Sequence, residues 1–321
     1  MKQFLIRQWF FIVLALGIGG ALLFPRPVQA ATQYWEPRSN IAVSLFLIAW
    51  TMASGSILVE LRRPFAAAWA VFLSYSLVPL AAWGLGRLSG NAQVEIGLLL
   101  IACVPCTLSA AVLWTRMAGG NEATALLAIV GTILLGWLFT SLWLTSLTGT
   151  AVPLAVGPMM IDLVLILVFP VIAGQALRLI TRCARFADKY RTPIGIVSQC
   201  LVLIILFRAG ATVGLRLHEG DAAGMAWIVL ASVVFSLTLH LIAIIVSFAT
   251  CRWLGFDRGQ QIAVAFSASQ KTIQVSLALY DQYYQAAFPY AIVPMLCYHV
   301  GQLILDTLIA KRLKQLPQAQ G

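Results

Sequence analysis

A dense run of polar residues inside an apolar segment is the part of this sequence best suited to chemistry. The stretch FSASQKTIQ, residues 266–274, places Lys271 among hydroxyl and amide side chains. Ammonium, hydroxyl and amide groups bind ions and polar solutes by hydrogen bonding and coordination. The run therefore predicts a binding site, with these residues as its candidate ligands: Ser267, Ser269, Gln270, Lys271 and Thr272.

The rest of the chain is strongly apolar. Its 321 residues are 61% hydrophobic and only 10% charged, against about 25% charged residues in an average soluble domain. Apolar runs of about 20 residues, long enough to span a bilayer, recur along nearly the whole length. These runs are continuous rather than alternating, which favours helices over a β-barrel. We therefore predict an all-α, polytopic membrane protein whose first partner is the lipid bilayer.

We predict ten membrane-spanning helices in a single integral membrane unit. Residues 1–177 would hold the first five-helix repeat (helices at about 9–147) and the start of the second, followed by a basic cytoplasmic loop at 178–193. Residues 193–321 would hold helices seven to ten and a short basic tail. The expected helices are 9–24, 41–59, 64–87, 95–117, 122–147, 152–177, 193–215, 225–250, 259–280 and 286–309.

The basic residues test this topology, because lysine and arginine accumulate in cytoplasmic loops. With the N-terminus inside, 15 of the 21 lie on the cytoplasmic side and 4 on the other, while Arg208 and Lys271 lie at membrane depth. We therefore expect a multi-pass protein of the inner (plasma) membrane with both termini in the cytoplasm. This distribution over short loops also explains the net charge of +10 without a nucleic-acid partner.

The N-terminal segment allows two interpretations. A basic start, an apolar centre and the sequence VQAA at 28–31 are compatible with a cleaved signal peptide. The topology instead requires a retained first helix, which we expect to end at Pro25.

The predicted fourth helix contains Pro105, with Thr107 and Ser109 just after it. Proline removes a backbone donor and frees carbonyl groups one turn earlier, which in lipid must find other partners. A simple kink, with the hydroxyls bonded to their own helix, is the alternative. Five helices per half would make the second half an inverted repeat, and the polar run of helix nine would then correspond to Pro105. Two interrupted helices in matching positions indicate a transport site near the midplane.

The depth of Lys271 supports this site. It lies about a dozen residues from either end of its predicted helix, too far for its stem to reach water easily. Charges at such depth usually face the bundle interior and mark substrate, ion or proton pathways. The nearby pair Cys103 and Cys106 has the spacing of a redox or metal motif but lacks a second pair or a histidine beside it, so we interpret it as packing.

At these two segments the sequence resembles the bile acid:sodium symporter superfamily, and more closely its SBF-like branch. The stretch VPCTLSAAVLWTRMAGGNEATAL from Val104 is similar to the branch pattern VPTTVSSSVVLTRxAGGNEAAAL, and FSASQKTIQVSLAL from Phe266 is similar to FxGSxKTLAxG. A third stretch, FLIAWTMASGSILVELRR from Phe46, looks like the FLxSGLSL segment and its basic turn. The resemblance covers nearly the whole chain and implies ten helices in two inverted repeats, divided into a panel and a core domain. Helices four and nine would cross as broken helices, with sodium bound behind the crossing near Thr107, Ser109, Ser269 and Gln270.

Three departures from the family pattern bear on the ion. Ala110 and Ala111 stand where the branch has serines, and Phe266 stands where sodium symporters carry an acidic residue. Lys271 follows the crossing glutamine, at a position that is usually uncharged. A fixed cation beside a sodium pocket is strongly unfavourable at low dielectric. We therefore expect that Lys271 either takes the place of sodium by bonding carbonyls near Pro105, or exchanges a proton as the coupling group.

Further ionisable groups lie at membrane depth, and several keep two interpretations. Arg208 either pairs with Asp162 on an adjacent helix or binds an anionic substrate. His240 and His299 are interpreted as packing residues, and Asp306 as solvated or paired with a nearby lysine. Asn121 is interpreted as a helix cap that can also support the site.

Together these features predict a secondary transporter that moves a small organic anion by alternating access, without a cofactor other than Na⁺ or H⁺ as coupling ion. The sequence lacks the G-x-S-x-G, H-E-x-x-H and phosphate-loop motifs of enzymes, so we do not expect an enzyme. A channel and a non-transporting membrane sensor are the alternative classes. Substrate identity and oligomeric state do not follow from the sequence.

Overall fold

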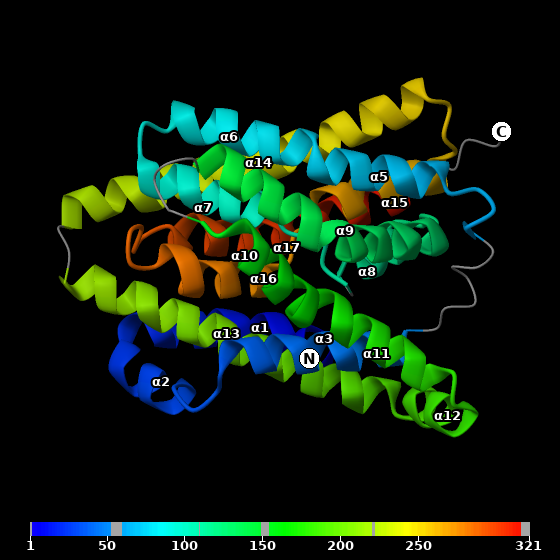
Figure 1. Ribbon diagram of the computed structural model, residues 1–321, viewed down its shortest axis with the longest axis horizontal. Coiled ribbons are helices and arrows are strands. Elements are labelled where there is room, and N and C mark those ends of the chain that lie inside the picture. Colours follow the sequence, from blue (N-terminus) through cyan, green and yellow to red (C-terminus); the bar gives the residue numbers. More distant parts are fainter. Residues whose placement is uncertain (1, 53–59, 109, 149–153, 220–221, 316–321) are drawn as a thin grey trace. The chain divides into compact units, whose positions relative to one another are not determined.

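The computed structural model describes residues 2–52, 60–108, 110–148, 154–219 and 222–315. Within these ranges the chain forms helices and connecting segments, and no strand is present. The predicted all-α class is therefore confirmed. The chain divides into two compact units: Met1–Met52 with Phe169–Trp227, and Ala53–Val168 with Ile228–Gly321 (Figure 1).

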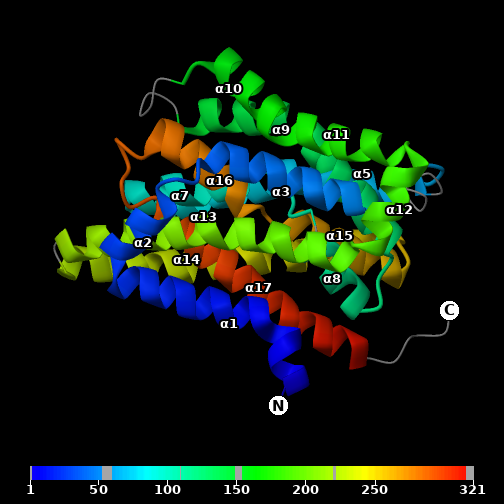
Figure 2. The same cartoon turned by 90° about the horizontal axis from the view of Figure 1, so that it is seen from below.

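The first unit is a bundle in which neighbouring helices pack along their lengths. α3 packs against α11 and α13, and α13 also packs against α1 and α2 (Figure 2). The short α12 lies within the predicted basic loop 178–193. The helices of this unit are α1 (Lys2–Leu23), α2 (Pro25–Thr32), α3 (Pro37–Thr51), α11 (Phe169–Arg178), α12 (Thr181–Lys189), α13 (Arg191–Glu219) and the start of α14 (Ala222–Trp253).

Proline sets the end of the first helix, as the sequence predicts. α1 ends at Leu23, α2 begins at Pro25, and the two helices are bent by 114°. The ring of Pro25 is tolerated at the first position of α2, where a backbone donor would have no partner within the helix.

In the second unit, two long helices each pack against several shorter ones. α9 packs against α5, α7, α8, α10 and α15, while α17 packs against α7, α8 and α16. Besides most of α14, its elements are α5 (Phe65–Tyr75), α6 (Leu77–Leu88), α7 (Ala92–Ala102), α8 (Ala110–Met117), α9 (Glu122–Thr148), α10 (Val156–Leu163), α15 (Arg258–Ser269), α16 (Ile273–Leu279), α17 (Ile292–Gln315) and the π-helical segments η2 (Val164–Val168) and η3 (Tyr280–Tyr284).

Local signals explain where the helices of the second unit begin and end. Gly119, with a positive φ of 76°, ends the turn after α8 in a conformation that favours glycine. Asn121 then caps α9, because its side-chain oxygen accepts hydrogen bonds from the backbone of Ala123 (3.0 Å) and Thr124 (3.2 Å). Asp257 forms a capping box with Gln260 at the start of α15. The capping interpretation of Asn121 is confirmed.

Each of the ten predicted ranges contains helix within the described residues. Six helical segments are long and apolar enough to cross a membrane, and the bent pair α1–α2 makes a seventh if it counts as one span. α3 ends at Thr51, and the end of the predicted range 41–59 lies outside the described residues. The predicted ranges 95–117 and 259–280 are each split into two shorter helices.

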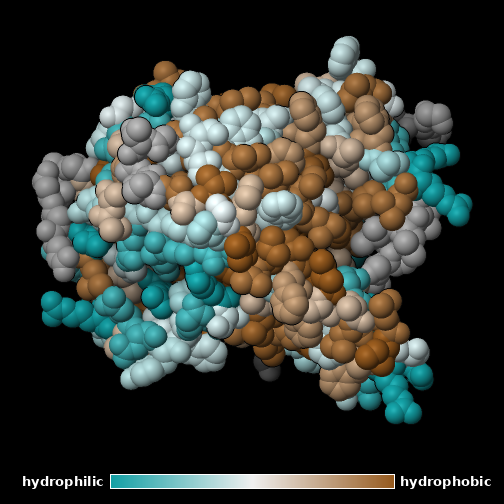
Figure 3. Space-filling view, viewed as in Figure 1, coloured by the Kyte–Doolittle hydropathy of each residue, from teal (hydrophilic) through white to brown (hydrophobic). Residues whose placement is uncertain are grey.

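The surface is that of a membrane protein. Apolar side chains cover large areas of the visible face (Figure 3). Large hydrophobic side chains that are exposed in each unit would be costly in water but are favourable against lipid. They include Ile172 and Trp227 of the first unit and Leu165, Leu230, Ile245 and Ile304 of the second.

Candidate functional site

The first interruption of the second unit lies between α7 and α8. α7 ends at Ala102, three residues before Pro105, because proline disfavours helical backbone in the residue before it. Side chains of α9 satisfy the backbone groups that the break exposes: the Thr140 hydroxyl donates to the carbonyl of Cys103 (2.7 Å), and the Cys106 amide donates to Thr132 Oγ1 (3.2 Å). The predicted break near Pro105 is therefore a true interruption rather than a kink.

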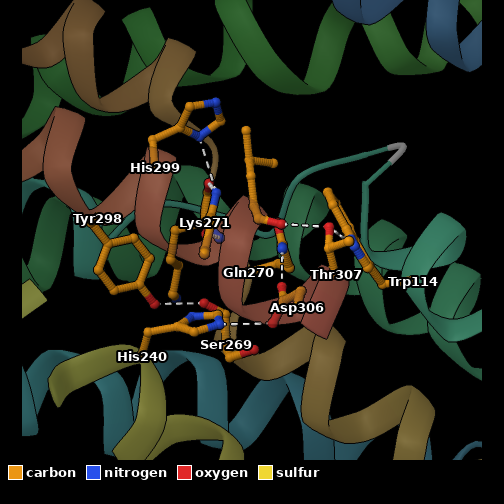
Figure 4. Close-up of polar contacts among 11 residues, drawn as sticks. Trp114, His240, Ser269, Gln270, Lys271, Tyr298, His299, Asp306 and Thr307 are labelled. Atoms are coloured by element: carbon orange, nitrogen blue, oxygen red, sulfur yellow. Dashed lines mark hydrogen bonds and ion pairs between the residues drawn. The ribbon is translucent and has the colours of Figure 1, made fainter. Parts of the chain in front are cut away.

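The second interruption lies between α15 and α16, at the polar run. Gln270 and Thr272 have extended backbone, with ψ of 133° and 113°. Gln302 of α17 satisfies both backbone groups of Lys271, accepting from its amide (2.9 Å) and donating to its carbonyl (2.9 Å). The Tyr298 hydroxyl donates to the carbonyl of Ser269 (2.6 Å). One face of α17 thus acts as the partner of this break (Figure 4).

The two interruptions contact each other directly. The Thr272 amide donates to the carbonyl of Pro105, and the Thr107 hydroxyl donates to the carbonyl of Lys271, each at 3.0 Å. Residues more than 160 positions apart in the sequence therefore share hydrogen bonds at one point of the second unit. The residues of the candidate site lie around this contact.

The ammonium group of Lys271 lies at this contact and is fully buried. Its Nζ donates to the Ser74 carbonyl (2.8 Å), the Ser74 hydroxyl (2.8 Å) and the carbonyl of Val104 (3.2 Å). The ring centroid of Tyr75 lies 5.4 Å from Nζ, within the range of a cation–π interaction. Among the residues that the structure describes, no carboxylate lies within ion-pair distance of Nζ. Neutral oxygen atoms and an aromatic face are thus what stabilises this cation.

The structure brings most of the predicted site residues together. Pro105, Thr107, Ser269, Gln270, Lys271 and Thr272 all lie at the contact of the two interruptions. Ser267 lies one helical turn earlier in α15, and its buried hydroxyl lacks a hydrogen-bond partner in the described part of the chain. Ser109 lies outside the described residues. Cys103 and Cys106 are buried free thiols.

Asn121 and Arg208 do not take part in that contact. The side chain of Asn121 caps α9, and its backbone N–H donates to the carbonyl of Gly259 (2.9 Å). Arg208 belongs to the first unit, where its guanidinium donates to the carbonyl of Trp35 (3.4 Å). Asp162 belongs to the second unit and accepts from Gln282 and Tyr283 there. The pairing of Arg208 with Asp162 stays a prediction.

Two polar side chains have a different role from the one the sequence suggested. Asp306 is fully buried, so the interpretation of a solvated or lysine-paired residue is wrong. Its Oδ1 lies 2.8 Å from Nε2 of His240, and its Oδ2 accepts from Nε2 of Gln270. His240 is therefore part of the network around the second interruption rather than a packing residue only (Figure 4).

The sequence carried one signal for this network that we missed. His299, Gln302 and Asp306 follow each other at spacings of three and four residues, which places them on one face of α17. His299 Nδ1 lies 3.0 Å from Gln302 Nε2, so all three belong to the same polar stripe. Ser74 and Tyr75 carried no such signal, because they are neighbours at the end of the apolar α5 and do not repeat at helical spacing.

Some polar atoms at the second interruption have no hydrogen-bond partner within the described residues. They are the hydroxyls of Ser267 and Ser269, Oε1 of Gln270 and Nδ1 of His240, all buried. Buried polar groups without partners are rare and indicate a place for a ligand, an ion or water. Hydroxyl and amide oxygens are suitable ligands for a hard cation such as sodium. The described residues hold no cluster of three or more His, Cys, Asp or Glu side chains that would suit a transition metal.

A groove with a volume of about 870 Å³ lies between α5 and α9 of the same unit. Its lining is almost entirely apolar, and none of the lining residues is charged. Tyr75 lines the groove and also contacts the ammonium of Lys271. The groove thus offers apolar surface, whereas the charged and hydrogen-bonding groups belong to the two interruptions.

Interrupted membrane helices that contact each other are typical of secondary transport proteins. A model of the SBF-like CPA transporter family matches residues 8–315, nearly the whole chain, and the chain belongs to this family. It is thus a multi-pass membrane transport protein, as the resemblance predicted.

Individual relatives are similar at low identity. Sodium/bile acid cotransporter 7 of Danio rerio is 27% identical over 243 residues, which cover 74% of this chain and 71% of that protein. The protein of the same name in Mus musculus is 22% identical over 324 residues, covering 96% and 93%. The probable sodium/metabolite cotransporter BASS4, chloroplastic, of Arabidopsis thaliana is 28% identical over 231 residues, covering 68% of this chain and 52% of that protein.

Proposed function

We propose that this protein is a secondary transporter that moves a small organic anion across the membrane by alternating access. The observation that carries this proposal is the hydrogen-bonded contact of two helix interruptions, Thr272 to Pro105 and Thr107 to Lys271. Interrupted helices expose backbone groups and helix ends that can bind ions and solutes at membrane depth. The transporter family and the cotransporter names of its relatives support this function.

The proposed architecture is ten spanning helices in two inverted five-helix repeats, with α7–α8 and α15–α16 as the broken fourth and ninth helices. The division into units supports it. The first unit takes the first, second and seventh predicted helices and the end of the sixth from Phe169, while the second unit takes the third to fifth, the sixth up to Val168, most of the eighth, and the ninth and tenth. Apart from the sixth, which is divided between the units, corresponding members of each half therefore fall in the same unit. We propose that the units are the panel and the core, respectively.

The proposed orientation places both termini in the cytoplasm and the protein in the inner membrane. The excess of lysine and arginine in the loops assigned to the cytoplasm supports it. Labelling of single cysteines introduced in loops, with a reagent that does not cross the membrane, tests this orientation.

We propose that the ammonium of Lys271 takes the place of a bound sodium ion in holding the interruptions together. Nζ donates to the carbonyl of Val104, the residue directly before Pro105, and to two oxygen atoms of Ser74. A cation that is part of the protein would stabilise these buried oxygens without an ion from solution. Proton exchange by Lys271 itself is the alternative role for the same side chain.

Sodium coupling is a second candidate, favoured by one specific observation. The Ser269 hydroxyl and Gln270 Oε1 are buried oxygens without partners in the described part of the chain, as expected of ligands awaiting a cation. Thr107 and Ser109 complete the ligand set that the family resemblance implies. The names of the relatives, which are sodium cotransporters, support this candidate as well.

Recognition of the anion is proposed to involve Arg208, whose planar guanidinium binds carboxylate and sulfonate groups well. The family resemblance favours an amphipathic organic anion, such as a steroid conjugate or a carboxylate.

Counterflow in proteoliposomes tests the function. Vesicles loaded with an unlabelled bile acid conjugate should accumulate the labelled compound transiently, with saturation, because a carrier exchanges solutes across the membrane. Linear flux without exchange would indicate a channel, and the absence of flux for a panel of organic anions would favour a sensor. Uptake that is unchanged when choline replaces sodium supports the role of Lys271. Sodium-dependent uptake that survives Lys271→Ala would refute that role.

A further inference from the structure

A buried pair of titratable side chains adjoins the second interruption. His240 of α14 and Asp306 of α17 lie 2.8 Å apart, and both side chains are 0% exposed. The carboxylate also accepts from the side chain of Gln270, the residue at which α15 ends. The pair is therefore connected by one hydrogen bond to the backbone break that carries the proposed site (Figure 4).

The hydrogen-bond geometry fits an ionised carboxylate beside a neutral imidazole. Each oxygen of Asp306 faces a nitrogen: Oδ1 faces Nε2 of His240, and Oδ2 faces the amide nitrogen of Gln270. An ionised carboxylate accepts both bonds, whereas a protonated one must donate from one of its oxygens. The imidazole then carries its proton on Nε2, which leaves Nδ1 as a buried acceptor with no partner among the described residues. The pair is thus arranged to accept one more proton.

Other titratable and charged groups surround the pair on the neighbouring elements. α17 contributes the phenol of Tyr298, with its ring edge-on to His240 at 5.6 Å, and the imidazole of His299, which contacts Gln302. The interruptions contribute the Cys106 thiol and the ammonium of Lys271, whose backbone is bonded by Gln302. The buried Asp306 carboxylate and Lys271 ammonium balance each other in charge. One added proton therefore changes the net charge of this core from zero to +1.

We propose that the His240–Asp306 pair binds one proton, and that this proton is the coupling ion of transport. This inference rests on the proposed function and specifies its driving ion. The proton comes from water on one side of the membrane and leaves to water on the other, without any redox change. When the proton is bound at Nδ1, the imidazolium attracts the carboxylate more strongly through the bond from Nε2 to Oδ1, which weakens Oδ2 as the acceptor for the side chain of Gln270. The backbone break at Gln270 thereby responds to the protonation state of the pair.

Sodium is a poorer occupant of this position than a proton. Both oxygens of Asp306 already receive hydrogen bonds from nitrogen donors, whose hydrogens point to where a cation would have to lie. A sodium ion would displace both donors, whereas a proton on Nδ1 of His240 displaces neither. A sodium ion near Ser269 and Gln270 would therefore have neutral oxygen ligands only.

Counting the protons that the protein binds tests the pair without any knowledge of the substrate. Purified protein in nanodiscs is acidified from about pH 8 to about pH 5, the range in which histidine side chains bind protons. An indicator dye measures the number of protons bound per chain. The wild type should bind one proton more per chain than the double variant His240→Gln, Asp306→Asn. Asp306→Asn alone should show the same deficit, because a buried imidazolium without its carboxylate is too costly to form.

Ser236→Ala is the matched control. Ser236 also joins α14 to α17, donating to the carbonyl of Pro294 (3.0 Å) in a buried position, but it does not titrate. This variant should bind as many protons as the wild type. Equal counts for wild type, Asp306→Asn and the double variant would overturn the proposal.

A transport assay then distinguishes proton coupling from the transport function itself. Proteoliposomes with a pH difference of one unit should accumulate a labelled bile acid conjugate up to about tenfold if one proton moves with each solute. Asp306→Asn should lose this accumulation, whereas the control Ser236→Ala should keep both the accumulation and counterflow. Accumulation that persists in Asp306→Asn, or that requires sodium instead of the pH difference, would overturn the proposal. Absence of counterflow in the wild type would refute the transport function, while the proton count still decides whether the pair binds a proton.

Discussion

Replacing Lys271 with alanine is expected to make the stability of this protein depend on sodium. The wild-type ammonium donates to two carbonyl oxygens and one hydroxyl in a fully buried position. Alanine removes these donors and leaves a space at the contact of the two interruptions. If the ammonium stands in for a sodium ion, that ion should bind to the same oxygens in the variant.

The magnitude follows from opposing contributions. Each of the two carbonyls left without a partner costs about 1–3 kcal/mol, and three lost methylene groups cost about 0.8 kcal/mol each. Because the variant no longer buries an ammonium group, the folded state avoids the desolvation cost of that charge, which is several kcal/mol. We therefore expect Lys271→Ala to lose about 1–4 kcal/mol of stability. Sodium at about 100 times its dissociation constant would restore about 2.7 kcal/mol, which corresponds to a rise in Tm of about 4 °C for a chain of this length.

Thermal unfolding in detergent, with sodium chloride or choline chloride at equal ionic strength, measures this shift. Lys271→Met is the matched control, since methionine also removes the charge but fills most of the space that a cation would need. The wild type and Lys271→Met should unfold at the same temperature in both salts, and only Lys271→Ala should gain stability from sodium. The reasoning is refuted if the alanine variant ignores sodium, or if all three proteins gain equally.

Three further predictions concern stability in the same unfolding assay. Gln302→Leu should cost about 1–3 kcal/mol, because the amide of Lys271 loses its partner while its carbonyl keeps the hydrogen bond from Thr107; Gln302→Glu, which can only accept when ionised, should lie between leucine and wild type unless the glutamate is protonated. Gly97→Ala should prevent folding, since its methyl group would overlap the backbone carbonyl of Ala291, whereas Gly84→Ala, with open space around it, should gain up to about 1 kcal/mol. Asn121→Ala should lose about 1 kcal/mol with the α9 cap, and Asn121→Asp should keep most of it.

Much of the helical layout could be predicted from the sequence, because hydropathy and proline act locally. The continuous apolar runs indicated helices, and Pro25 and Pro105 ended helices where their missing donors required it. The break in the ninth predicted helix was indicated by polarity alone. Its residues include no proline, so the prediction depended on the cost of placing hydroxyl, amide and ammonium groups in lipid.

The partners of these breaks could not be predicted in the same way. Gln302 and Asp306 belong to α17, whose composition resembles that of any spanning helix, and their functional surroundings arise only when α17 packs against α16. A spacing of three and four residues indicates a polar face, but not which backbone groups that face will meet. The interpretation of Asp306 is wrong for this reason, because a residue close to the basic tail in sequence need not lie close to it in space.

The break between α15 and α16 depends on partners from both directions of the chain. The amide of Thr272 bonds the carbonyl of Pro105, far upstream, and both backbone groups of Lys271 bond Gln302, 31 residues downstream. Without these partners, residues 269–272 would satisfy their backbone best by continuing the helix, because open backbone in lipid costs several kcal/mol per group. The break between α15 and α16 therefore depends on these partners, whereas the break at Pro105 also follows from proline itself and from its partners in α9. A transporter needs a site of this kind, since an element whose two arrangements differ by a few exchangeable hydrogen bonds can be shifted by the binding of one ion or solute.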